Sequence, residues 1–77
     1  MARTLADLPV GVEAVLEALD LPVEVGARLM ELGFLPGARV VSVGSAPSGD
    51  PKVFRVDGGE VALRRETARH LRIRVSL

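Results

Sequence analysis

A tight-turn signal between two strand-like segments restricts the fold more than any other feature of this sequence. The tripeptide Asp-Gly-Gly at 57–59 separates Lys52–Val56 from Glu60–Arg64. Asp-Gly favours two-residue turns with positive φ at both positions, and such turns join neighbouring antiparallel strands. The sequence therefore predicts a β-hairpin over residues 52–64.

Two further segments have the character of strands. Ala38–Val43 is rich in valine, and Arg72–Val75 alternates arginine with apolar residues, as a strand with one buried face does. Pro-Gly at 36–37 predicts a type II turn before the first of them, and GSAPSGDP at 44–51 predicts a loop after it. The opening segment Thr4–Pro9 is expected to be extended.

The segment Val12–Leu19 is compatible with two structures. Its apolar residues alternate with Glu13 and Glu17, as in a half-buried strand. Glutamate, alanine and leucine are also good helix formers, so propensity favours a helix. The residues alone leave both alternatives open.

Residues 22–33 predict a helix. Pro22 suits a first helical turn, and Gly33 suits the position that ends a helix. Gly26 inside this helix costs roughly 1 kcal/mol relative to alanine, which suggests a close packing contact there. The apolar residues with i, i+4, i+7 spacing, expected to form one face of the helix, are Val25, Leu29 and Leu32.

The order of these segments predicts a single small, mostly β domain over residues 1–77. Short strands joined by a hairpin, without a βαβ rhythm, are typical of a small barrel. One short helix is expected at Glu66–Leu71. The 77 residues include two Phe but no Tyr, Trp or Cys. Val, Leu and Ala must therefore form the core, and disulfides and thiolate metal sites are excluded.

The residue types argue against an enzyme. His70 is the only histidine, and no serine lies in a G-x-S-x-G setting, so a nucleophile with its base is not expected. Glu66 and His70 have i, i+4 spacing on the predicted short helix, but two ligands do not complete a metal site. We therefore predict no catalytic residue, no bound metal and no cofactor.

Binding to nucleic acids or membranes is not expected either. Small barrels that bind nucleic acids add aromatic platforms to a basic groove, whereas Phe34 and Phe54 both lie in apolar contexts. No apolar run approaches the roughly 20 residues that span a bilayer, and the N-terminus lacks the features of a signal peptide. The sequence predicts a cytoplasmic protein that does not insert into a membrane.

Charge is unevenly divided although its total is zero. Residues 1–34 hold two basic and six acidic residues, and residues 35–77 hold eight basic and four acidic ones. We expect the arginines of the second half to lie on the solvent faces of strands and to pair with the acidic half.

Two regions are candidates for contact with another protein. Met30, Phe34 and Leu35 provide more apolar area at the helix end than one core stripe needs, although Phe34 and Leu35 would otherwise complete the core. The loop at 44–51 is long relative to its neighbours, and such loops often carry binding residues. Alternatively, this loop does no more than connect two strands. Two Phe do not suffice for the aromatic groove that binds proline-rich peptides.

Three stretches, in the same order, resemble the signatures of the FeoA family. They are LGFLPG at 32–37, APSGDP at 46–51 and VALRRETA at 61–68, and LADLPVG at 5–11 is similar to the family's usual start. The resemblance implies a small SH3-like five-stranded β-barrel with one α-helix inserted after the first strand. It also implies a short helical turn before the last strand, and it assigns Val12–Leu19 to a strand.

The same resemblance implies a small cytosolic, non-enzymatic accessory protein of bacterial ferrous iron uptake. Its partner would be FeoB, a membrane transporter with a cytoplasmic GTP-binding domain, and docking would favour one transporter conformation. The chain departs from many members in having VGA at 25–27, where basic residues are common, and Ser48, where leucine is common. The candidate partner-binding residues are Met30, Phe34, Leu35, Pro47, Asp50, Pro51, Arg64, Arg65 and Arg69.

Two other functions are compatible with the sequence. The same fold occurs as the C-terminal domain of DtxR-like metal-dependent repressors, so the chain could be an interaction module of metal-dependent transcription control. It has no segment for a helix-turn-helix and would act on a separate repressor. A ferrous-ion carrier would use Glu66 and His70. An exposed barrel edge could also pair with a second copy of the chain.

Overall fold

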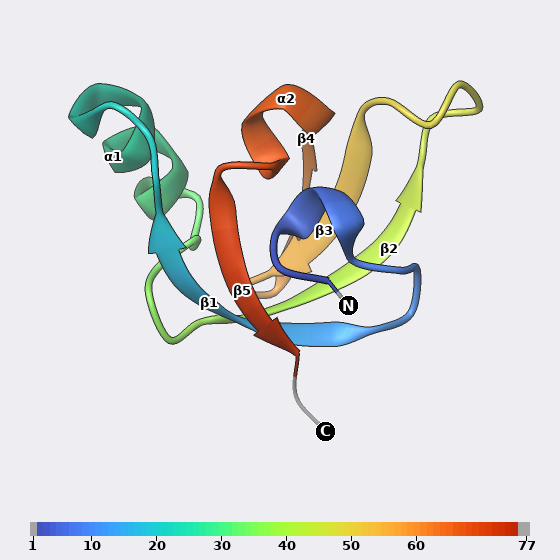
Figure 1. Cartoon of the computed structure of the whole chain (residues 1–77), viewed down its shortest axis with the longest axis horizontal. Helices are drawn as coiled ribbons and strands as arrows, with labels where there is room; N and C mark the ends of the chain where they lie inside the picture. The colour runs from blue at the N-terminus through green and yellow to red at the C-terminus, as the bar shows by residue number, and fades with distance from the viewer. Residues whose placement is uncertain (1, 76–77) are drawn as a thin grey trace.

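Short valine-rich segments with alternating burial build a single antiparallel sheet in the computed structural model, which describes residues 2–75. Met1 and residues 76–77, the ends of the predicted domain, lie outside the described residues. The strand order is β4-β3-β2-β1-β5 (Figure 1). The elements are η1 (a 3₁₀ turn, Leu5–Asp7), β1 (Glu13–Leu19), α1 (Val23–Glu31), β2 (Arg39–Ser45), β3 (Lys52–Val56), β4 (Gly59–Leu63), α2 (Arg65–Ala68) and β5 (Leu71–Val75).

The two turns expected from local sequence are present. Asp57 and Gly58 have φ values of 50° and 77°, and Val56 pairs with Gly59, which is the two-residue hairpin with positive φ at both central positions. At the second turn, the N–H of Ala38 donates to the carbonyl of Leu35 at 2.8 Å across Pro-Gly at 36–37. Both predictions are confirmed.

The ambiguous segment is strand β1. It pairs with β2 on one side and with β5 on the other, so its backbone groups are used in two ladders. Ala14 and Leu16 point into the core and are fully buried, while Glu13 and Glu17 face solvent. Tertiary pairing therefore overrides the helix propensity of this segment.

The expectation of an extended opening segment was wrong. Leu5–Asp7 forms a 3₁₀ turn, closed by the N–H of Asp7 on the carbonyl of Thr4 at 3.1 Å. Leu5 and Leu8 are fully buried in the core, and a turn is what brings both side chains to the same side. The segment thus contributes to the core.

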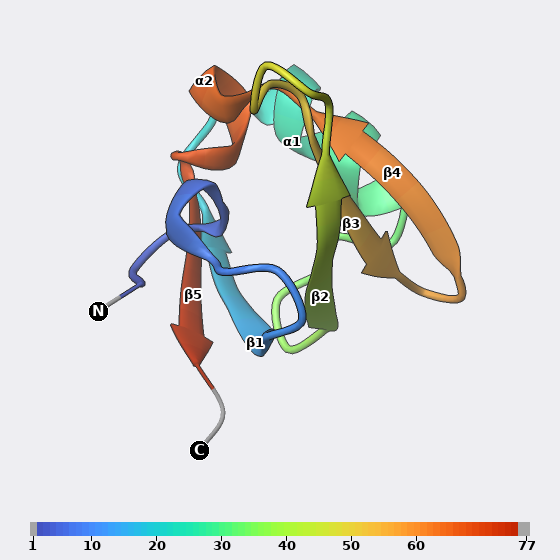
Figure 2. The same cartoon turned by 90° about the vertical axis from the view of Figure 1, so that its right-hand side faces the viewer.

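The five strands do not close into a barrel, in contrast to the prediction. β4 and β5 are the two ends of the sheet and are not paired with each other. The chain turns into α2 between them, so the two strands separate (Figure 2). The free edge of β5 is covered by the N-terminal segment instead, because Thr4 bridges to Arg72 and the N–H of Ile73 donates to the carbonyl of Arg3 at 2.9 Å. The expected fold is therefore correct in its strands and helices but not in its closure.

The core is aliphatic and surrounds the two phenylalanines. Phe34 and Phe54 are fully buried, as are most of the residues around them. Burial of this apolar area stabilises the fold by about 25 cal/mol per Å². The buried apolar residues are Leu5, Leu8, Ala14, Leu16, Leu29, Phe34, Val40, Phe54, Val56, Leu63, Ala68, Leu71 and Ile73.

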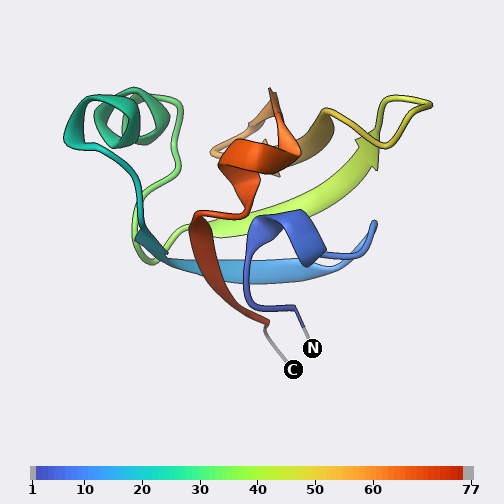
Figure 3. The ribbon, with the colours of Figure 1, turned by 45° about the horizontal axis from the view of Figure 1, so that its top comes forward.

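Helix α1 stands apart from the sheet (Figure 3). The expected core-facing stripe was wrong in two of its three positions, because Val25 and Leu32 are exposed and only Leu29 is buried. After Leu32 the chain reverses at Gly33, which has a φ of 107°, and Phe34 enters the core. In the part of the chain that the structure describes, no helix has the length and apolar character needed to cross a membrane.

Candidate docking surface and the junction of loop and helix

Exposed apolar side chains are concentrated on α1 and the turn that follows it. Of the six large apolar residues exposed in the described structure, five lie between residues 23 and 35. Val23 and Met30 lie on one side of α1 and Val25 on another, so apolar area is exposed on more than one face of the helix. Exposed apolar area on a small protein marks interaction sites. The five residues, with their exposed fractions, are Val23 (86%), Val25 (41%), Met30 (40%), Leu32 (49%) and Leu35 (49%).

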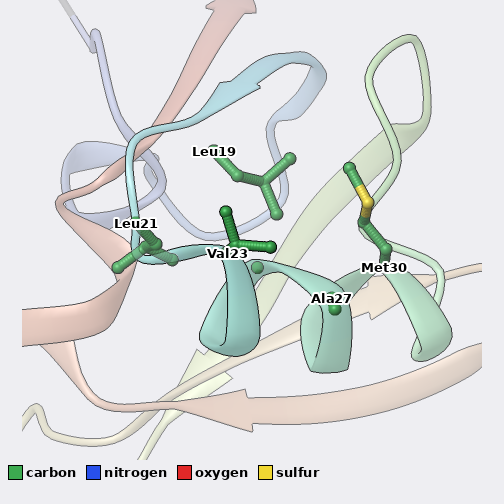
Figure 4. Close-up of a pocket in the computed structure, with 6 residues that line it drawn as sticks. Leu19, Leu21, Val23, Ala27 and Met30 are labelled. Atoms are coloured by element: carbon green, nitrogen blue, oxygen red, sulfur yellow. The ribbon is translucent and has the colours of Figure 1, made fainter.

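A groove runs between α1 and the end of β1. Its volume is about 270 Å³, and the residues that line it are all of apolar type. Val23 and Met30 project from α1 on the side of Leu19 (Figure 4). The lining residues are Leu19, Leu21, Val23, Gly26, Ala27 and Met30.

The structure separates the three candidates at the helix end. Met30 and Leu35 are exposed and adjoin the groove or the following turn. Phe34 is fully buried, so it belongs to the core and cannot contact a partner. The alternative considered for Phe34 from sequence, completion of the core, is therefore the one that the structure shows.

The candidates in the loop and α2 meet in one junction. The Asp50 carboxylate accepts a hydrogen bond from the backbone N–H of Arg65 at 3.0 Å. The guanidinium of Arg65 donates from Nε to the carbonyl of Gly49 at 2.9 Å and from Nη1 to that of Ala6 at 3.3 Å. Asp50 and Arg65 thus have a structural role that orders the loop, while Pro47 is exposed and Pro51 half-buried.

The remaining arginines of the cluster are available to a partner. Arg64 and Arg69 are exposed, and within residues 2–75 no carboxylate pairs with either. Arg69 Nε lies 3.4 Å from His70 Nε2. Elsewhere Arg72 pairs with Asp20 at 2.9 Å, so the expected pairing of the basic half with the acidic half is present there.

Sequence reasoning missed Lys52. This side chain is only 5% exposed, and its Nζ donates to the carbonyls of Leu8 at 2.8 Å and Ala6 at 3.1 Å. Burial, with the nearby charge of Arg65, lowers the pKa of Lys52 below its ordinary 10.5, and Asp7 acts in the opposite direction. Its position was the available signal, because Lys52 alternates with Phe54 and Val56 on the inward side of β3.

Glu66 and His70 do not assemble a metal centre with other side chains. Within residues 2–75, no three His, Asp or Glu residues are grouped closely enough to hold a metal ion. Glu66 lies on the short helix α2, and His70 lies just after the end of that helix. Its i, i+4 spacing alone supports no ligand set.

Comparisons with known proteins agree with this architecture. The FeoA domain family matches residues 3–75. No curated protein sequence matches the chain. The solution structure of iron(II) transport protein A from Clostridium thermocellum is similar, with a TM-score of 0.88 and 32% identity over 94% of this chain. That protein is longer, and the match covers 44% of its length.

Two other solved structures are similar over nearly the whole chain. The FeoA protein from Chlorobium tepidum has a TM-score of 0.88 and 29% identity, covering 94% of this chain and 69% of that one. FeoA from Stenotrophomonas maltophilia, in complex with zinc, has a TM-score of 0.77 and 35% identity, covering 97% and 91%. The latter is described as a prokaryotic SH3 domain protein and a candidate activating factor of ferrous iron transport.

Proposed function

Because this chain belongs to the FeoA family, we propose that it is a cytoplasmic, non-enzymatic accessory protein of ferrous iron uptake that docks on a FeoB-like GTP-binding transporter. Two similar proteins are described as an iron(II) transport protein and a candidate transport activating factor. The observation that carries the docking proposal is the exposed apolar surface of α1 and the turn after it. Such a surface is typical of a protein that acts by binding another protein.

Docking would act on the transporter through its conformations. A protein that binds one state of a partner more tightly shifts the population toward that state. The accessory protein then tunes uptake or nucleotide turnover without chemistry of its own. Met30 and Leu35 would supply apolar contacts, and Arg64 and Arg69 would supply charged ones at the α2 side.

The direct test is calorimetric titration of the transporter's cytoplasmic domain with the full chain and its Leu35→Glu variant. Leu35 is half exposed, so the substitution leaves the core intact. We expect affinity to fall by about tenfold or more, as for a contact residue at an interface. The matched control is Val10→Glu, at the one large apolar exposed residue of the described chain outside residues 23–35. Unchanged affinity for Leu35→Glu would remove the helix end from the docking surface.

The arginines are tested separately. Arg64→Glu and Arg69→Glu reverse two exposed charges that have no carboxylate partner within residues 2–75. We expect slower association and a weaker salt dependence, because exposed charges act mainly on the encounter rate. Arg65 is left intact because it orders the loop. If both variants associate at the wild-type rate over a range of salt, the charged contact is excluded.

The two other functions have less support. The repressor-module reading has no matching observation beyond a shared fold, and fold alone does not assign function. The ion-carrier reading needs more ligands than Glu66 and His70, and residues 2–75 hold no group of three.

A further inference from the structure

We propose that the groove between α1 and the end of β1 receives an amphipathic helix of the partner. The apolar side of that helix would enter the groove, and its lysine or arginine residues would lie beside Glu24 and Glu31. The identification of the partner with the transporter rests on the function proposed above. The shape of the groove and the charges beside it are independent of that proposed function.

The groove is suited to side chains and not to a cofactor. Its six lining residues are all apolar, and its volume is about 270 Å³. Sites for small molecules are usually larger and include a few placed polar groups. A row of aliphatic side chains from a protein partner suits both the small volume and the apolar lining of this groove.

The floor of the groove is low at Gly26. This residue is buried, yet a Cβ built on it would meet nothing within 4 Å. With Ala27 beside it, α1 offers a place where another backbone can approach closely. Among residues 2–75 the predicted packing contact of Gly26 is therefore not made, and a partner would make it.

A helix fits this groove better than an extended strand. One wall is α1, whose backbone groups are used within the helix, as where the N–H of Gly26 donates to the carbonyl of Pro22 at 2.9 Å. Such a wall cannot extend a β-ladder, so apolar side chains must supply the contacts. Recognition then takes the form of an amphipathic helix lying in a groove.

The charge of the neighbouring residues selects a basic partner. Glu24 and Glu31 each follow a lining residue, Val23 and Met30, by one position on the helix. One position is about 100° of rotation, so both glutamates flank the groove on the solvent side. Arg28 lies on the same side of α1, four positions after Glu24, so two glutamates against one arginine leave this side with an excess of negative charge. Lysine or arginine on the incoming helix would complement them.

A second copy of this chain is a poorer occupant. The apolar helix that it could offer is its own α1, which would bring Glu24 and Glu31 opposite the same two residues. Like charges placed together oppose association. This helix carries two glutamates and one arginine, Arg28, so two α1 helices facing each other would both have an excess of negative charge. The other exposed arginines all lie outside α1: Arg3, Arg39, Arg55, Arg64, Arg65, Arg69, Arg72 and Arg74.

The test uses the full chain and two synthetic helical peptides of about 18 residues, which is about five turns. Both have the same leucine face, one with flanking lysines and the other with flanking glutamates. Amide chemical shifts follow the titration. We expect the lysine peptide to bind about tenfold more tightly or better, with shifts confined to the groove and α1. Equal affinity for the two peptides, or shifts centred elsewhere, would overturn the proposal.

Variants locate the binding site. Gly26→Leu fills the floor and should weaken binding of the lysine peptide by about tenfold. Ala62→Leu is the matched control, since it adds similar bulk at an exposed position on β4. If Gly26→Leu does not fold, Ala27→Gln places an uncharged polar side chain at an exposed lining position and carries the same expectation. Normal binding by a folded groove variant would refute the assignment.

Two further measurements complete the experiment: peptide binding by a charge-reversed variant, and titration of the transporter domain. The double variant Glu24→Lys, Glu31→Lys should prefer the glutamate peptide, and an unchanged preference would contradict the charge argument. Titration of the transporter domain with Gly26→Leu separates the two proposals. If Leu35→Glu weakens docking and Gly26→Leu does not, the proposed function stands and the groove proposal fails. If the lysine peptide binds in the groove while the transporter domain does not bind at all, the groove proposal stands without that partner.

Discussion

The carboxylate of Asp50 accepts a hydrogen bond from the backbone N–H of Arg65 at 3.0 Å, across fifteen positions of sequence. Helix α2 begins after Arg64, whose own side chain makes no capping hydrogen bond. Asp50 therefore caps α2 from a different segment of the chain. Two of the family motifs, the loop at 46–51 and the segment at 61–68, are joined by this contact.

Replacing Asp50 by alanine should reduce stability through loss of the cap. The expected cost is about 0.5–2 kcal/mol, and exposure of the contact favours the lower end. Urea unfolding measures it, and faster exchange of the Arg65 amide would localise it. Asp50→Asn keeps an acceptor oxygen and should lose less. If Asp50→Ala were as stable as the wild type with a protected Arg65 amide, the capping role would be wrong.

Because Lys52 is buried, we predict that the free energy of unfolding increases with pH in the alkaline range. Its pKa is lowered in the folded state, so between that value and the ordinary 10.5 the unfolded chain binds more protons than the folded one. Stability therefore increases as the pH rises through this interval. We expect the stability of the wild type relative to Lys52→Met to increase toward pH 10.5, as measured by urea unfolding at a series of pH values. A constant or falling difference would contradict the burial of the charged form.

Gly33 is predicted to be the least replaceable glycine of the helix end. It has a φ of 107°, and a Cβ there would lie 2.6 Å from Cβ of Asp57. Gly33→Ala should cost about 1–3 kcal/mol for the backbone strain, with the steric overlap in addition. The double variant Gly33→Ala, Asp57→Gly should recover the steric part alone. Gly44→Ala is the control, because its surroundings are open, and equal melting temperatures for Gly33→Ala and Gly44→Ala would disprove the prediction.

Ser42 should be better replaced by alanine. It is fully buried on β2, and its Oγ has no hydrogen-bond partner among the described residues. An unpaired buried hydroxyl costs about 1–3 kcal/mol, so Ser42→Ala is expected to raise the free energy of unfolding by about 1 kcal/mol. Ser45→Ala, at an exposed position of the same strand, should have little effect. A loss of stability in Ser42→Ala would reveal a partner for the hydroxyl in solution.

Self-association, if it uses a sheet edge, should use β4. The pairing of Val56 with Gly59 closes the hairpin, so the alternation of an antiparallel ladder directs the backbone groups of Glu60 and Ala62 outward. We expect weak dimerisation at high concentration in sedimentation velocity, lost in Ala62→Pro, which removes an outward N–H without breaking the internal ladder. Persistence of the dimer in that variant would assign it to another surface.

Part of the fold follows from short stretches of sequence. The hairpin at 57–59 and the turn at 36–37 depend on the φ preferences of two or three consecutive residues, and both are present. The alternation of Arg72–Val75 likewise corresponds to exposed arginines and the buried Ile73 on β5. Such features are local, so no distant contact is needed to decide them.

The candidate docking residues were only partly predictable. Met30 and Leu35 were expected to exceed what the core needs, and both are exposed. Phe34, next to Leu35, is buried, and the difference arises from the chain reversal at Gly33 and not from hydrophobicity. The groove also needs Leu19 and Leu21, which are remote in sequence from Met30 and have no pattern in common with it.

The sequence by itself determined the turns, the strand-forming segments and the family, because each depends on neighbouring residues or ordered motifs. The family resemblance assigned Val12–Leu19 to a strand, which β1 confirms, although local preferences in that segment left a helix equally open. Tertiary structure alone decided that the sheet stays open between β4 and β5 and that α1 stands exposed. It also decided the burial of Lys52, whose Nζ reaches carbonyls 44 and 46 positions away. The physical reason is common to these cases: backbone pairing and burial depend on which distant groups meet, and local preferences are too weak to specify that.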